Sequence, residues 1–195
     1  KNVFGSKKTY SPSVNEKLNL MSEGTVHNMF GCQEMDELMN DGMPTVKVND
    51  ICVHYIQKEA QELLLSNLEA SRKVRCSKII TPRQAQTNCW FNTMFVMFFV
   101  SDKGRKFFKY FRAMMIMGVK GELIKSRGTI EEIDSLREKA TSKDVLSREL
   151  HKSLFLLNLA IEACLTGNEY AYALNTNDLI LEIHTAIANS PGGAK

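Results

Sequence analysis

The run Asn88-Cys89-Trp90-Phe91-Asn92-Thr93-Met94-Phe95-Val96-Met97-Phe98-Phe99-Val100 is apolar from Trp90 onward, except at Asn92 and Thr93. A helix that is apolar on all sides is normally buried among other elements. At 1.5 Å per residue this one would be about 18 Å long, which is too short to cross a bilayer. We therefore predict a mainly α fold, a helical bundle around a buried central helix that begins near Cys89. A strand over 95–100 is the alternative, because short apolar runs do not separate strand from helix.

The composition is that of a soluble globular protein. The chain has 195 residues, of which 44% are hydrophobic and 24% charged, and its net charge is +3. This charge is too small to indicate a nucleic-acid partner, so none is expected. The polar segment 1–45 predicts an extended N-terminal arm with a short helix over 33–40, and 46–195 predicts a single helical domain. A first residue other than Met is compatible with a fragment of a longer protein.

Hydrophobic periodicity and capping residues predict the other elements. Val46 and Val48 alternate with polar residues, which indicates a short strand. Asn49 or Asp50 can cap a long helix that runs to about Arg72. The later helices are predicted over 103–117 after the cap Ser101-Asp102, over 129–140, from Thr141 or Ser142 to Thr166, and from Thr176 or Asn177 to about 190. Gly118 and Gly167 are placed to end two of them.

The cysteines and histidines do not indicate a metal or a set of structural crosslinks. There are five cysteines, an odd number, and no CxxC pair. A disulfide framework and a zinc site are therefore disfavoured, and a reducing, intracellular compartment is expected. The four histidines lack ligand spacing, and no phosphate loop or dinucleotide fingerprint occurs. No cofactor and no metal are expected.

The residues around Cys89 have the composition of a nucleophile site. The amides and positive dipole end at a helix N-terminus favour a thiolate. Acyl transfer also needs hydrogen-bond donors for a developing oxyanion, and Gln84, Gln86 and Asn88 are three amides close before the cysteine. We expect Trp90 to pack beneath the helix and fix the position of the cysteine. The alternative is that Cys89 is only a small buried hydrophobe at the head of a core helix.

Five positions resemble a known family. Gln84, Cys89, Trp90, Asn92 and Thr93 are similar to the cysteine box of papain-like cysteine peptidases, most closely that of the ubiquitin-specific proteases. The resemblance implies that Cys89 is the nucleophile and Gln84 the oxyanion donor. It also implies that the helices are the helical half of a papain-like fold, with an α+β papain-like fold as the alternative. The substrates would be ubiquitin-like C-termini or viral precursor proteins.

The base histidine of that family follows the cysteine in a strand-rich half. Only His151 and His184 follow Cys89 here, and both lie in predicted helices. His184 is the candidate base within this chain, and a histidine outside the chain is the alternative. His27 and His54 precede the cysteine, which is the reverse of the family's order. A degenerate relative without activity is a further interpretation.

A second resemblance concerns a wider span. Residues 86–93, the Phe-rich segment and 101–108 look like proteins of large DNA viruses. This implies a non-catalytic structural or assembly protein of a virus particle as the alternative function, with neighbouring subunits as partners and the virion as its location. Ten methionines and the basic aromatic segment suit such contacts. Residues 103–117 also have the composition of a membrane-surface helix.

Overall fold

The structure is a computed structural model that describes residues 44–69, 73–84, 87–119, 141, 144–168 and 170–189. Within these ranges the chain is mainly helical and has one two-stranded sheet. The predicted fold class, mainly α, is confirmed at that level. The predicted helices over 33–40 and 129–140, and all but the end of the N-terminal arm, lie outside the described residues.

A β-hairpin precedes the helices. Strands β1 (Thr45–Val48) and β2 (Ile51–His54) pair antiparallel, with Val48 opposite Ile51. The two residues between them, Asn49 and Asp50, have φ values of 48° and 66°. Two consecutive left-handed residues form the tight turn that matches the twist of a hairpin, and Asn and Asp tolerate this conformation.

The hairpin confirms one prediction and corrects another. The strand predicted at Val46 and Val48 is present. The long helix predicted from Asn49 or Asp50 to about Arg72 is wrong at both ends, because 51–54 is a strand and the helix runs only from Lys58 to Ser66. The Asn49-Asp50 pair acts as a turn and not as a helix cap, since its positive φ values reverse the chain.

The helical segments follow the hairpin. They are α3 (Lys58–Ser66), the 3₁₀ segment η2 (Cys76–Lys78), α4 (Cys89–Phe95), the π-helical segment η3 (Val96–Val100), α5 (Asp102–Phe107), α6 (Lys109–Met117), α8 (Arg148–Thr166), α9 (Tyr170–Ala173) and α10 (Thr176–Ala188). Ser101 caps α5 by accepting from the Gly104 amide, as predicted. Gly118 and Gly167, with φ values of 68° and 73°, end α6 and α8 as predicted. The predicted helix over 103–117 is divided at Phe108.

The last two long helices begin near their predicted starts. Helix α8 is capped by Ser147, a few residues after the predicted cap, because Val145 forms a bridge with Val119 and the Leu146 amide donates to the Gly118 carbonyl. Extended pairing at 145 and 146 excludes a helix there. Helix α10 is capped by Asn175, one residue before the first predicted cap.

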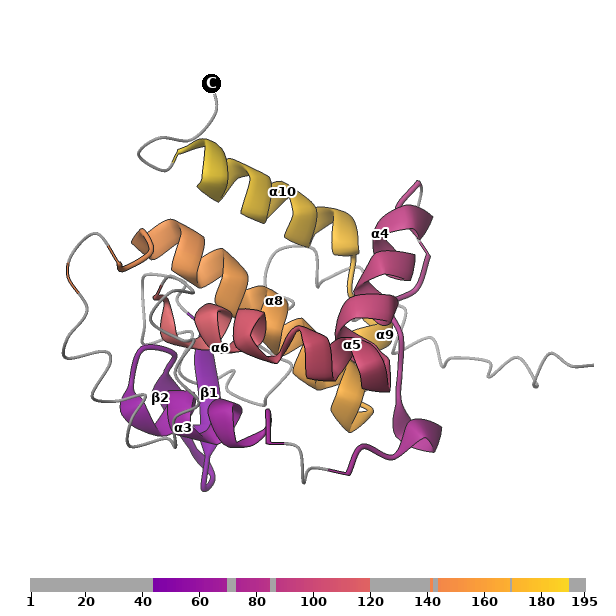
Figure 1. The fold of residues 1–195 in the computed structure, drawn as a ribbon, viewed down its shortest axis with the longest axis horizontal. Helices are drawn as coiled ribbons and strands as arrows, with labels where there is room; N and C mark the ends of the chain where they lie inside the picture. The colour runs from indigo at the N-terminus through magenta and orange to yellow at the C-terminus, as the bar shows by residue number, and fades with distance from the viewer. Residues whose placement is uncertain are drawn as a thin grey trace, which may run out of the picture.

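Helix α8 is the central helix of the fold. It lies between α10 and α6 and contacts both, and it also touches α9 and η3 (Figure 1). Every residue from Ser153 to Leu165 is buried. One side of α8 packs with Phe95 and Phe99 of the Phe-rich segment. The other packs with the hairpin, α3 and α6 through Phe155 and Leu159.

The prediction that the central helix begins near Cys89 is therefore wrong. In α4 the buried residue is Phe95, and in η3 the buried residues are Phe99 and Val100. Trp90 is 55% exposed and Met97 is 54% exposed. The segment packs against α8 along one side only, so its apolar composition reflects an uncovered surface as well as a core contact.

Candidate functional site

Cys89 is the first residue of α4 and its side chain is exposed. It lines an open groove of about 500 Å³ between the start of α4 and the preceding segment. The lining residues are Thr81, Pro82, Gln84, Cys89, Asn92, Thr93, Val96 and Met97. None of these side chains is charged. The interpretation of Cys89 as a buried hydrophobe is wrong, because the thiol faces solvent in a groove.

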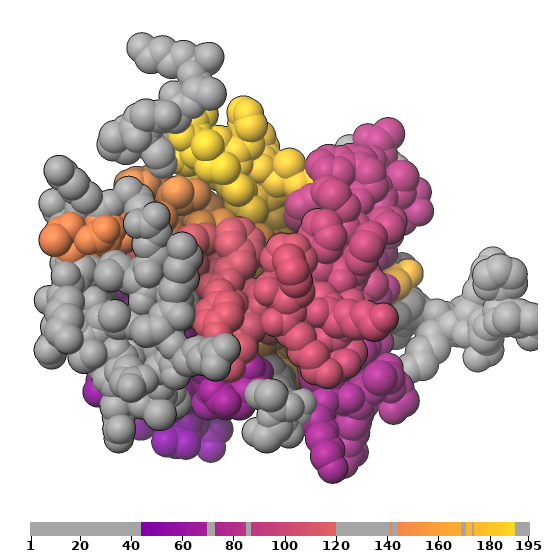
Figure 2. Space-filling view, viewed as in Figure 1, coloured from indigo at the N-terminus to yellow at the C-terminus, as the bar shows by residue number. Residues whose placement is uncertain are grey.

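A relay of hydrogen bonds fixes the wall of this groove. The buried Asn88 side-chain amide donates to the Thr176 hydroxyl at 2.8 Å, and that hydroxyl donates to the Asn92 side-chain oxygen at 2.6 Å. The Asn92 amide then donates to the Arg83 carbonyl at 3.1 Å. The relay joins the start of α4, the start of α10 and the segment at Arg83 before the cysteine. Helices α4 and α10 lie together at the surface (Figure 2).

The segment that carries Gln84 is also held from its other side. The Ile80 amide donates to the Cys164 carbonyl at the end of α8, and the Arg83 amide donates to the Tyr172 carbonyl in α9. Gln84 is thus presented by backbone that is anchored to three helices. Its exposed side chain lines the same groove as Cys89, so the structure brings these two predicted residues together.

The other amides before the cysteine have different positions. Asn88 occupies the cap position of α4, but its side chain makes no cap hydrogen bond, because its amide is directed to Thr176. Gln86 lies outside the described residues. Trp90 does not pack beneath the helix as expected, since it is largely exposed and meets Phe91 edge-on at 5.7 Å. Gln84 is therefore the described amide that remains as a candidate donor.

No described histidine lines the groove. His184 is exposed on α10, and its position eight residues after Thr176 is about 12 Å further along the helix axis. His151 is buried in α8, where its Nε2 lies 3.1 Å from the Ile116 carbonyl oxygen and its ring meets Tyr55 edge-on. His54 is in β2, and its Nδ1 accepts from the Ile56 amide. The structure does not bring His184 to Cys89.

The four described cysteines differ in oxidation state and in exposure. Cys76 and Cys89 are exposed free thiols, and Cys164 is a buried free thiol in α8. Burial raises the pKa of the Cys164 thiol to about 12, so this thiol is unreactive near neutral pH. Cys52 in β2 is disulfide-bonded, which differs from the expectation of reduced cysteines.

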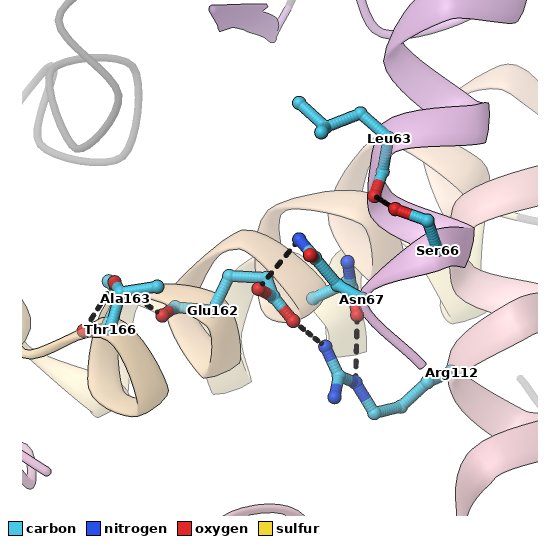
Figure 3. Close-up of polar contacts among 8 residues, drawn as sticks. Leu63, Ser66, Asn67, Arg112, Glu162, Ala163 and Thr166 are labelled. Carbon is cyan, nitrogen blue, oxygen red and sulfur yellow. Dashed lines mark hydrogen bonds and ion pairs between the residues drawn. The ribbon is translucent and has the colours of Figure 1, made fainter. Parts of the chain in front are cut away.

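A cluster of hydrogen-bonded polar side chains lies in the core, away from Cys89, and was not predicted from the sequence. Arg112 of α6 pairs with Glu162 of α8, and both side chains are buried. The Arg112 Nε donates to Asn158 at 2.9 Å, and the Asn67 amide donates to Glu162 at 3.1 Å. Figure 3 shows the Arg112 and Asn67 side chains directed at the Glu162 carboxylate from two sides. The pair joins α6 to α8, and Asn67 adds the end of α3.

The described residues hold no cluster of three or more His, Cys, Asp or Glu side chains that could bind a metal. No helix in the described part of the chain is long and apolar enough to cross a membrane. Comparisons of the chain with protein-family models, curated proteins and solved structures find no match.

Proposed function

We propose that this protein has a cysteine-peptidase site of the papain-like type, with Cys89 as nucleophile and Gln84 as oxyanion donor. The observation that carries the proposal is the exposed Cys89 thiol at the first position of α4, in one groove with Gln84. Helix N-termini promote thiolate chemistry, and a side-chain amide beside the sulfur can stabilise an oxyanion. The resemblance of the cysteine box to that of ubiquitin-specific proteases supports the same two roles.

The reaction would proceed by acyl transfer. The Cys89 thiolate sulfur forms a bond to the carbonyl carbon of a peptide or isopeptide bond, and the Gln84 amide donates to the oxyanion that develops. The C–N bond breaks, the nitrogen takes up a proton and leaves as an amine, and the acyl group remains on Cys89 as a thioester. Water then attacks the thioester, which releases a carboxylic acid and restores the thiol.

The groove also indicates a class of substrate. Its walls carry hydroxyl, amide and apolar side chains and no charged side chain among the eight lining residues. Such walls suit an extended peptide segment that is uncharged next to the cleaved bond, at the C-terminus of a ubiquitin-like protein or at a cleavage site in a viral precursor. No described histidine lines the groove. The base that takes the proton of the Cys89 thiol is therefore proposed to lie outside the described residues or on a partner chain.

Labelling with ubiquitin that carries a C-terminal electrophile tests this function. We expect a single adduct on Cys89, lost in Cys89→Ala and retained in Cys76→Ala, which removes the other exposed free thiol among the described residues. Gln84→Ala should slow labelling by about tenfold or more, because the oxyanion donor is removed. A peptide electrophile tests the precursor class in the same way. Equal labelling of Cys76 and Cys89, or an unmodified Cys89 with both probes, would contradict the proposal.

A non-catalytic assembly function is the second candidate, and exposed apolar side chains favour it. Phe107 is 79% exposed, and Tyr110 and Phe111 lie beside it on the α5–α6 segment. This segment forms the front surface in Figure 2, next to α4 and α10. Loss of assembly in Phe107→Ser or Phe111→Ser, with Cys89→Ala unaffected, would support subunit contacts. Full assembly by both Phe variants would exclude that surface.

The fold reduces the number of apolar side chains in 103–117 that are available to contact a membrane surface. The apolar residues Met115, Ile116 and Met117 of α6 are buried in the core, so they are not free to enter a bilayer. The side chains that remain for such contact in 103–117 are those of Phe107, Tyr110 and Phe111.

A further inference from the structure

A second pocket lies away from Cys89, between the end of α3, helices α5 and α6, and the end of α8. It encloses about 240 Å³. Its charged lining residues are Arg105, Lys106, Lys109, Arg112, Asp102 and Glu69. Pockets for drug-sized ligands begin at about 300 Å³, so this one suits a small ligand or a single chemical group.

The carboxylates near this pocket are fewer than the cations that line it. Glu162 is buried and pairs with Arg112, which lines the pocket (Figure 3). Asp102 is shared, because Arg105 and Lys106 both pair with it at 3.1 and 3.0 Å. Lys109 lies 3.9 Å from Glu69, which is beyond hydrogen-bond distance. The lining therefore carries one more cation than these three carboxylates neutralise.

Two further observations concern the charged residues that line this pocket. The Arg105 Nε is buried and has no hydrogen-bond acceptor among the described residues. A buried donor without a partner is rare in folded proteins, and a bound group that attracts the guanidinium can supply an acceptor. At the rim, a hydrogen bond from Lys106 and the charges of Lys106 and Arg105 lower the pKa of Asp102.

We propose that this pocket binds a phosphate-type oxyanion, either as a soluble phosphate compound or as the headgroup of a lipid. A tetrahedral phosphate offers several acceptor oxygens to donors that converge from different directions. Arg105, Lys106 and Lys109 supply such donors from consecutive turns of α5 and α6. Arg112, fixed by Glu162, closes the inner side.

Titration of the full chain with inorganic phosphate at constant ionic strength, followed by amide chemical shifts, tests the pocket. We expect saturable shifts in 102–112. The double variant Lys106→Gln, Lys109→Gln should weaken binding by about tenfold or more, which is at least about 1.4 kcal/mol. Lys103→Gln is the matched control, because it removes the same charge from α5 at an exposed position outside the pocket. Asp102→Asn should tighten binding, since it removes the carboxylate that competes for Arg105 and Lys106.

The opposite results would overturn the proposal. They are shifts that grow linearly without saturation, an equal loss of binding in Lys103→Gln, or weaker binding in Asp102→Asn. Flotation with phosphatidylcholine vesicles, with and without a phosphoinositide, separates the two sources of the oxyanion. Phosphoinositide-dependent flotation that is lost in the double variant and kept in Lys103→Gln assigns a headgroup. No flotation together with saturable phosphate binding assigns a soluble ligand.

Discussion

The Phe-rich segment formed by α4 and η3 and the helix α8 are both strongly apolar, yet they occupy opposite environments. Helix α8 is covered on several sides and buries every residue from Ser153 to Leu165. The α4–η3 segment buries Phe95, Phe99 and Val100, but it exposes Trp90 and Met97. The segment thus combines a core contact with a surface that carries the thiol of Cys89 at its start.

The difference shows that polar residues can mark the more buried of two helices. Helix α8 contains Asn158 and Glu162, both at most 1% exposed, and Arg112 of a neighbouring helix donates to the side-chain oxygen of each. A buried charge needs an opposite charge and hydrogen-bonding groups around it. A helix that is covered by its neighbours has side chains close enough to supply them. The Phe-rich segment has no charged residue from Cys89 to Val100. Its composition alone therefore predicted that it would be the central helix of the bundle.

The largest effect is expected from breaking the buried ion pair. Glu162→Ala should lower the free energy of unfolding by about 3–5 kcal/mol, because the buried Arg112 guanidinium loses the carboxylate that balances its charge. The double variant Arg112→Met, Glu162→Leu should recover most of that loss. In the exposed pair Lys58–Glu62, Lys58→Ala should cost only about 0–1 kcal/mol. Denaturant unfolding measures all three, and a small effect of Glu162→Ala would contradict the central position of α8.

Truncation of one apolar side chain in each helix compares the two environments directly. Leu159→Ala in α8, where the side chain is fully buried, should cost about 2–5 kcal/mol. Met97→Ala in η3, where the side chain is 54% exposed, should change stability by about 0.5 kcal/mol or less. Equal losses in denaturant unfolding would show that the Phe-rich segment is covered after all.

The relay that holds the start of α4 should respond to loss of one hydroxyl. Thr176→Val removes a hydrogen-bond partner of both Asn88 and Asn92, and should cost about 1–3 kcal/mol because the buried Asn88 amide and the half-buried Asn92 amide each lose a hydrogen bond. Thr185→Val is the control, since Thr185 is exposed on the same helix. Thermal unfolding of the two variants gives the comparison, and identical melting temperatures would contradict the relay.

The buried thiol of α8 gives a smaller, pH-dependent effect. The pKa of Cys164 is raised from 9.0 to about 12 in the folded chain. Between these values the unfolded chain releases the proton and the folded chain keeps it. The contribution to stability is therefore complete below pH 9 and falls at higher pH by about 1.4 kcal/mol per unit. The stability difference between the wild type and Cys164→Ala should show this slope, and a constant difference would contradict it.

Local signals in the sequence predicted much of the helical structure. Ser101, Gly118 and Gly167 mark helix ends through capping and left-handed backbone, which depend on neighbouring residues alone. The hairpin at Asn49-Asp50 was missed because these residues also serve as helix caps, and the following apolar positions fit a helical period. The short strand before it was correctly predicted from alternation.

The contacts that build the candidate site were only partly predictable. Gln84 and Cys89 are five residues apart, so a local pattern could place them together, and both line the groove. Thr176 lies 88 residues after Asn88 in the relay, and Glu162 lies 50 residues after Arg112. Nothing in one sequence links such distant residues, because their pairing depends on how the helices pack around α8.

The most direct test of the proposed nucleophile compares two exposed thiols of the same chain. Cys89 begins α4 beside Gln84, whereas Cys76 begins the short segment η2 outside the groove. Alkylation by iodoacetamide at pH 7, resolved by site with mass spectrometry, measures both rates together. We predict that Cys89 reacts about tenfold faster than Cys76 or more, because its thiol lies in one groove with the Gln84 amide, which can hold the carbonyl oxygen of the reagent. Equal rates at the two cysteines would contradict it.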